Sequence, residues 1–143
     1  MKDSNPVIVS TVYDASIDKV WQALTDNAQM KQWYFQLPEF KAEVGFAFEF
    51  VGGPPDGIQY KHLCKITEVI PQKKISYTWI FDGYAGASEV AFELFDAAGK
   101  TKLVVTHSGI ETFDASNKDF DKVNFAEGWT HILTVSLADF LKR

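Results

Sequence analysis

The sequence predicts an α+β fold in which a curved antiparallel sheet of about six to seven strands wraps around one long C-terminal helix. Runs of alternating apolar and polar residues follow one another between positions 46 and 110, separated by turn-forming residues. Two short helical patterns precede these runs, and one long helical pattern follows them. Successive strands joined by turns pair antiparallel, so the helices are expected to gather on one side of the sheet.

The N-terminal elements are one strand and two short helices. Residues 7–13, VIVSTVY, are mostly β-branched or aromatic, which favours a strand. Ser16 is placed to cap a helix with an apolar stripe over residues 17–24. Asp26 is expected to cap a second short helix, because Gln29 three residues later completes the pattern of a capping box.

Further strands are expected between residues 46 and 110. Strict alternation places one set of side chains from each strand on the same face of the sheet. A mixed strand over residues 58–70 lies between the first and the second of these sets. The sets are Phe46, Phe48 and Phe50; Ile75, Tyr77, Trp79 and Phe81; Val90, Phe92 and Leu94; and Leu103, Val105 and His107.

The chain ends in a long amphipathic helix with a broad apolar face. Its apolar face is expected to include Phe125, Trp129, Ile132, Leu133, Ser136, Leu137, Phe140 and Leu141. The twist of a sheet prevents uniform contact with a helix, so a gap lined by aromatic side chains is expected between them. Gly128 costs this helix about 1 kcal/mol relative to alanine. That cost indicates a close approach to the sheet or a loop, or a helix that begins later.

Composition limits the classes of function. The net charge is −5 and no basic run exceeds Lys73-Lys74, so a nucleic-acid partner is not expected. No stretch is apolar for long enough to span a membrane, and a single cysteine, Cys64, excludes an internal disulfide. The N-terminus lacks the pattern of a signal peptide. We therefore expect a single domain over residues 1–143 in the reduced cytoplasm.

His107 is the most informative polar residue, because alternation turns it inward with Leu103 and Val105. It is expected either to bond neighbouring protein groups or to donate to a ligand. His62 and Cys64 share a strand face, but zinc would need further ligands beyond His107, so no metal and no other cofactor are expected. No motif of a catalytic nucleophile is present.

Residues 112–122 are polar and acidic, with Phe113 and Phe120 among three aspartates. This composition favours a solvated connection, and a mobile lid is the alternative.

Several motifs, in order along the chain, give it a family resemblance. These are ASIDKVWQALTDNAQMKQWY at 15–34, Tyr77-Thr78-Trp79, Thr106-His107-Ser108-Gly109 and Gly128-Trp129. The chain resembles the START-like helix-grip (SRPBCC) superfamily, in its branch of homologues of the activator of heat shock protein 90 ATPase. The resemblance implies a hydrophobic cavity between the sheet and the C-terminal helix. The side chains expected to bind a ligand there are Trp33, Phe48, Phe50, Tyr77, Trp79, Phe81, Phe92, Leu103, His107, Trp129 and Leu133.

The sequence thus favours a non-catalytic protein that binds a small apolar or amphipathic molecule, with Trp33 near the mouth of the cavity. The first alternative is a protein-interaction role with a partner such as a chaperone, as the resemblance implies. The second is a hydrolase or cyclase on the same scaffold, with His107 as the acid–base group.

Overall fold

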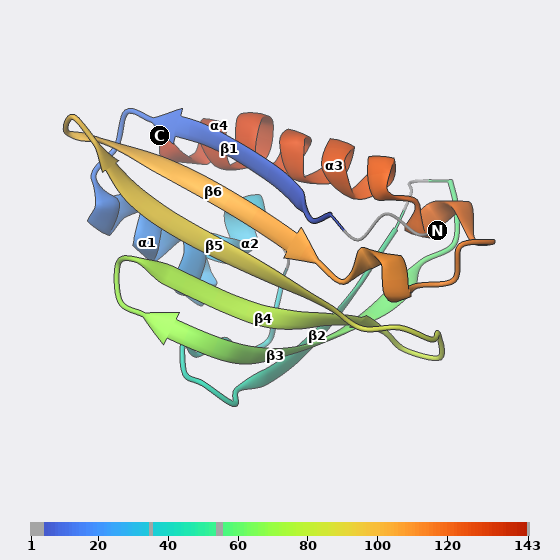
Figure 1. The fold of residues 1–143 in the computed structure, drawn as a ribbon. Helices are drawn as coiled ribbons and strands as arrows, with labels where there is room; N and C mark the ends of the chain where they lie inside the picture. The colour runs from blue at the N-terminus through green and yellow to red at the C-terminus, as the bar shows by residue number, and fades with distance from the viewer. Residues whose placement is uncertain (1–4, 35, 54–55, 143) are drawn as a thin grey trace.

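A computed structural model describes residues 5–34, 36–53 and 56–142. Within them, a six-stranded antiparallel sheet has the strand order β1-β6-β5-β4-β3-β2 (Figure 1). This confirms the predicted α+β class. The strands are β1 (Val7–Tyr13), β2 (Ala47–Gly52), β3 (Tyr60–Ile70), β4 (Lys74–Phe81), β5 (Ser88–Ala97) and β6 (Lys100–Ser108).

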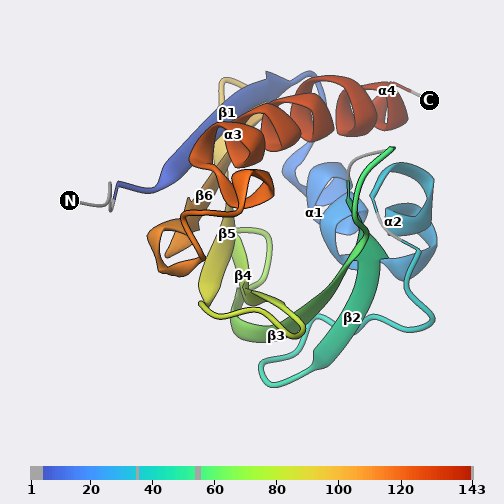
Figure 2. The ribbon, with the colours of Figure 1, turned by 90° about the vertical axis from the view of Figure 1, so that its right-hand side faces the viewer.

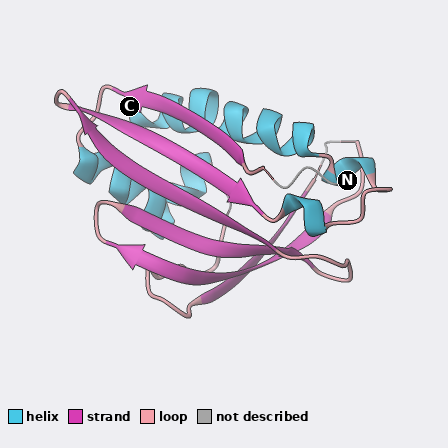
Figure 3. Ribbon diagram, viewed as in Figure 1, coloured by secondary structure: helices cyan, strands magenta, loops and turns pink. Residues whose placement is uncertain are grey.

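The helices cover the concave side of the sheet (Figures 2 and 3). Two of them, α1 (Ile17–Thr25) and α2 (Asn27–Trp33), follow the first strand as expected. The long C-terminal helix has three parts: α3 (Lys122–His131), the π-helical segment η3 (Ile132–Leu137) and α4 (Ala138–Leu141). Two short 3₁₀ turns, η1 (Ile110–Thr112) and η2 (Lys118–Phe120), connect β6 to this helix.

Of the two predicted helix caps, the structure confirms the first and not the second. The Ser16 side chain accepts a hydrogen bond from the Lys19 backbone N–H, so the first cap is confirmed. Asp26 does begin α2, but its side chain makes no capping bond. The Gln29 amide instead donates to Gln22 of the preceding helix. The capping-box prediction was therefore wrong, because the two helices meet closely enough for side chains of α1 and α2 to bond each other.

Side chains from the N-terminal elements fix the C-terminal helix in place. The buried Tyr13 hydroxyl donates to the Leu133 carbonyl at 2.6 Å, within the π-helical segment. Lys19 Nζ donates to the Leu141 carbonyl at 2.8 Å, which satisfies one of the free carbonyls at the end of the helix. None of the helices within the described residues has the length and apolar character needed to cross a membrane.

The predicted inward strand residues face the helix across a common core. The ring centroid of Trp129 lies 5.6 Å from those of Trp79 and Phe92. Leu103 and Leu133 are fully buried in the same core. The alternation of the strands and the period of the helix therefore placed the two sides of the core correctly.

Candidate functional site

Aromatic side chains fill the centre of the gap between the sheet and the C-terminal helix. Tyr34, directly after α2, brings its ring centroid to 6.4 Å from that of Trp129 and 6.5 Å from that of Phe92. Its hydroxyl lies 2.6 Å from the Tyr77 hydroxyl. Burial raises the pKa of both tyrosines, so both stay neutral at physiological pH. The centre of the predicted cavity is thus occupied by the protein itself.

Trp33 packs between α1 and the ring of Tyr34. Its indole Nε1 donates to the Ala23 carbonyl of α1 at 2.9 Å, and its ring stacks on Tyr34 at a centroid distance of 4.9 Å. The side chain is 7 % exposed. These contacts join α2 to α1 and differ from the expected place at the rim of a cavity.

His107 is the centre of a closed hydrogen-bond chain. Trp129 Nε1 donates to His107 Nδ1 at 3.0 Å, so in the neutral imidazole the proton lies on Nε2. His107 Nε2 lies 2.8 Å from Ser88 Oγ, and that hydroxyl donates to the Trp79 carbonyl at 2.7 Å. Burial lowers the pKa of His107 to about 3. Both ring nitrogens bond protein groups, which supports the structural role for His107 and argues against ligand contact.

The acidic segment after β6 packs as a cover over one end of the sheet. Phe113 and Phe120 are buried, and their ring centroids lie 5.1 and 4.5 Å from that of Phe81. The Tyr60 hydroxyl of β3 donates to Asp119 Oδ2 at 2.6 Å. Most of the other residues of the segment are exposed, so it is a solvated connection that its two phenylalanines hold against the sheet, and the mobile lid stays a prediction.

A pocket of about 390 Å³ opens beneath this cover, between the sheet and the first turns of α3. We call it the aromatic pocket. It lies where β2 and β4 end and β3 begins, which is one end of the gap between sheet and helix. The described residues that line it are Gly52, Gly53, Tyr60, His62, Trp79, Phe81, Asp119, Phe120, Asn124, Phe125 and Gly128.

His62 is the imidazole in the wall of the aromatic pocket. It stacks on Phe50 at a centroid distance of 4.4 Å, and its Nδ1 lies 3.0 Å from the Tyr60 carbonyl. Burial lowers the pKa of His62 to about 4 and raises that of the Cys64 thiol to about 12. Both groups are therefore neutral at physiological pH. No three His, Cys, Asp or Glu side chains of the described residues form a group that could hold a metal ion.

Gly128 leaves part of the pocket wall without a side chain. A Cβ atom built at this position would meet no atom within 4 Å. The predicted close approach of the helix to the sheet or to a loop was therefore wrong, and so was a later helix start, because α3 begins at Lys122. The glycine lies within a helix that would tolerate alanine, and the space that it leaves belongs to the aromatic pocket.

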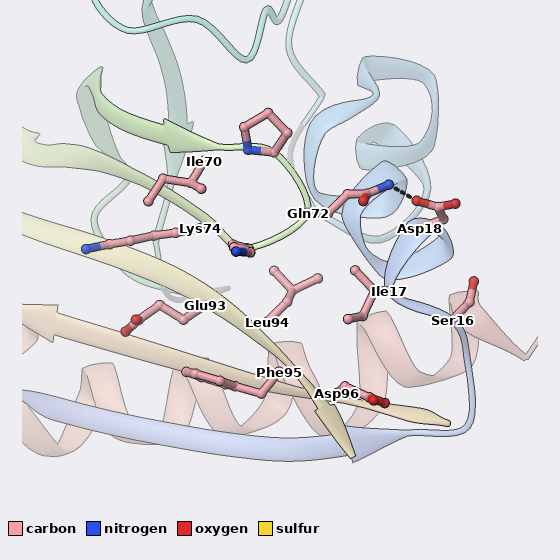
Figure 4. A pocket seen from close by; sticks show the side chains of 12 residues that line it. Ser16, Ile17, Asp18, Ile70, Gln72, Lys74, Glu93, Leu94, Phe95 and Asp96 are labelled. Atoms are coloured by element: carbon pink, nitrogen blue, oxygen red, sulfur yellow. Dashed lines mark hydrogen bonds between the residues drawn. The ribbon is translucent and has the colours of Figure 1, made fainter. Parts of the chain in front are cut away.

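A larger hollow of about 790 Å³ lies at the opposite end of β3 and β4 (Figure 4). Its floor includes Ile17 and Leu94, while Asp18 accepts a hydrogen bond from Gln72 across its edge. Charged side chains of both signs surround it, including Lys74 and Glu93. We favour the aromatic pocket as the candidate site despite its smaller volume, because it opens into the gap between the sheet and the C-terminal helix and its walls are largely aromatic.

The structure brings only part of the predicted site together. Trp79 and Phe81 line the aromatic pocket. The other predicted ligand-binding residues lie buried in the core and do not line it. These are Trp33, Phe48, Phe50, Tyr77, Phe92, Leu103, His107, Trp129 and Leu133.

Sequence reasoning missed Tyr60 and His62 in the pocket wall. Both belong to the alternation Tyr60, His62, Cys64 and Ile66 of β3, all buried on the face that points toward the helix. That period-two signal was present in the sequence and could have placed them. Asp119 and Asn124 had no such signal, because their positions depend on how the cover segment folds back onto the sheet.

A curved antiparallel sheet around a long C-terminal helix defines the helix-grip fold of START-like (SRPBCC) proteins. Residues 14–142 match the family model of Activator of Hsp90 ATPase homolog 1-like proteins, so the chain belongs to that family. The resemblance stated from the sequence motifs is thereby confirmed. No curated protein matches the chain.

Solved structures of similar proteins support the same fold. DynU16, a protein in the dynemicin biosynthetic locus, is 24% identical with a TM-score of 0.79; the match covers 98% of this chain and 48% of DynU16. This chain thus spans about half the length of DynU16. CV1439 from Chromobacterium violaceum is 21% identical with a TM-score of 0.80, covering 97% of this chain and 98% of that one. MLL2253 from Mesorhizobium loti is 26% identical with a TM-score of 0.77, and the match covers 97% of this chain and 98% of MLL2253.

Proposed function

We propose that residues 1–143 form one domain that binds a small apolar or amphipathic molecule in the aromatic pocket, without catalysing a reaction. The observation that supports this most directly is the pocket itself, with Trp79, Phe81 and Phe120 in its walls and few polar groups among them. Ligand sites in proteins have this composition. Membership of a START-like family is consistent with such a site.

The pocket volume limits the size of the ligand. At about 30 Å³ for each water molecule, 390 Å³ corresponds to about thirteen waters. A molecule with one ring and a short substituent fits this space. We place the protein in the reduced cytoplasm, because its one cysteine is buried as a neutral thiol.

A protein-interaction role is the second candidate, favoured by the family name and by apolar side chains on the outer face of the sheet. Val12 and Phe95 are 51% and 48% exposed and lie on either side of Lys102 in the strand register. Stimulation of the ATPase of an Hsp90-type chaperone by the purified protein, lost in Phe95→Ser, would support this role. No stimulation at saturating protein would exclude the activator role.

Variants of Gly128 test the ligand site. Gly128→Ala is expected to raise the free energy of unfolding by about 1 kcal/mol, because alanine favours the helix and its Cβ meets no other atom. Gly128→Leu should keep most of that gain but place its side chain in the aromatic pocket. We expect it to weaken binding of a fluorescent apolar probe at least about tenfold, equivalent to 1.4 kcal/mol. Urea unfolding and probe titration measure the two effects.

Val123→Leu is the matched control, because Val123 lies on the same helix, is 57% exposed and does not line the pocket. It should leave probe affinity unchanged. Equal affinity in the wild type and Gly128→Leu would show that the probe binds elsewhere.

A further inference from the structure

The aromatic pocket contains one carboxylate and no lysine or arginine side chain among the described residues that line it. The carboxylate is Asp119, which forms no ion pair with another described residue. His62 adds no positive charge near pH 7, because burial lowers its pKa to about 4. A bound anion would therefore meet an uncompensated negative charge, and a bound cation would neutralise it.

Two polar side chains in the wall of the pocket offer hydrogen-bond acceptors. The Tyr60 hydroxyl donates its proton to Asp119 Oδ2, and the Asn124 amide nitrogen donates to the Lys118 carbonyl at 2.7 Å. The other Asp119 oxygen and the Asn124 side-chain oxygen accept no hydrogen bond from the described residues. Asp119 and Asn124 therefore each offer an acceptor to a ligand, while the Tyr60 donor is already used.

The walls supply aromatic rings around this carboxylate. The centroid of Tyr60 lies 5.1 Å from that of Phe120 and 5.5 Å from that of Phe81. Trp79 and Phe125 complete the aromatic part of the lining. The faces of such rings carry partial negative charge and attract cations, and several rings together form the kind of site that holds alkylammonium groups.

We propose that the aromatic pocket binds an organic ammonium: a small apolar molecule with a protonated or quaternary amine that lies among the aromatic rings beside Asp119. This inference rests on the proposed function and specifies its ligand class. The cation neutralises Asp119, the rings contact its alkyl groups, and the free acceptors bond any N–H groups that it has. The same charge disfavours carboxylic acids such as fatty acids, which are anions at pH 7.

The test compares benzyltrimethylammonium with neopentylbenzene, its uncharged carbon isostere, and with phenylacetate. Each has a single ring and fits the volume of the pocket. Titration followed by tryptophan fluorescence and by NMR should show the ammonium binding about tenfold more tightly than the neutral isostere, with phenylacetate weakest. Asp119→Asn should reduce the affinity for the ammonium about tenfold and leave that for neopentylbenzene within about twofold.

Asp119→Asn removes the charge and keeps the local structure, because asparagine has a side-chain oxygen that accepts the Tyr60 hydrogen bond. Asp121→Asn is the matched control. Asp121 is exposed, does not line the aromatic pocket and makes no side-chain capping bond, yet its replacement changes the net charge equally. It should leave the affinity for the ammonium within about twofold of wild type.

Each contrary result has a distinct meaning. If neopentylbenzene binds as tightly as the ammonium and Gly128→Leu weakens both, the ammonium inference fails and the proposed function stands. If no probe binds, both fail. Equal losses of ammonium affinity in Asp119→Asn and Asp121→Asn would overturn the inference, because the effect would then come from overall charge.

Discussion

Acidification from pH 7 to pH 4 is expected to lower the free energy of unfolding by about 6 kcal/mol, because two buried histidines are neutral in the folded protein. The folded-state pKa values of His62 and His107 are about 4 and about 3, against an ordinary 6.5. Below pH 6.5 the unfolded chain binds protons at both sites, while the folded protein does not. Stability is therefore complete above pH 6.5 and falls as the pH approaches the folded-state values.

A loss of this size approaches the whole stability of an ordinary domain, so the protein should be largely unfolded near pH 4. Urea titrations followed by tryptophan fluorescence at pH 7, 6, 5 and 4 measure the change. The slope of stability against pH should be steepest between pH 6 and pH 4.

His107→Gln identifies the contribution of one site. A glutamine amide can accept from Trp129 through its oxygen and donate to Ser88 through its nitrogen, but it does not titrate. The variant should lose about half of the pH dependence. His131→Gln is the control, because His131 is exposed. An unchanged slope in His107→Gln would show that other groups cause the acid sensitivity.

Much of the fold could be predicted because its signals are local. The alternation of Ile75, Tyr77, Trp79 and Phe81 and the helical spacing after Phe125 each depend on neighbouring residues alone. The face of the sheet or helix on which a side chain lies decides whether it is buried, and the period of the sequence indicates that face. The two sides of the core therefore followed from the sequence.

The site was harder to predict because tertiary contacts decide which part of the gap stays open. Tyr34 follows α2 in a backbone conformation that is neither helical nor strand, with φ −120° and ψ −122°, so no period indicates where its ring points. Its ring occupies the centre of the gap, and the aromatic pocket lies toward one end. Gly128 was noticed as a cost to the helix, but whether a glycine provides close contact or open space depends on the atoms across from it.

Trp129→Ala is expected to lower the free energy of unfolding by about 3–5 kcal/mol, the range for removing a buried tryptophan side chain. The indole is 3% exposed and packs on Trp79 and Phe92, so its loss leaves a cavity between the sheet and the helix. It also removes the donor to His107 Nδ1. Urea unfolding monitored by circular dichroism measures the loss. Trp129→Phe should lose less, because a ring still fills most of the space.

Free indole should partly restore the stability of Trp129→Ala, because it matches the cavity and its N–H can donate to His107 Nδ1. Benzofuran has nearly the same shape but no N–H, so it should restore less by about 1–3 kcal/mol, the cost of an unpaired buried acceptor. The measurement is the rise in Tm with ligand concentration, with the wild type as control. Because Trp79 belongs both to this cavity and to the aromatic pocket, Trp129→Ala should also admit larger apolar probes than the wild type does. Equal rescue by indole and benzofuran would show that His107 does not depend on the indole donor, and no rescue by either would mean that the core collapses into the space that Trp129 leaves.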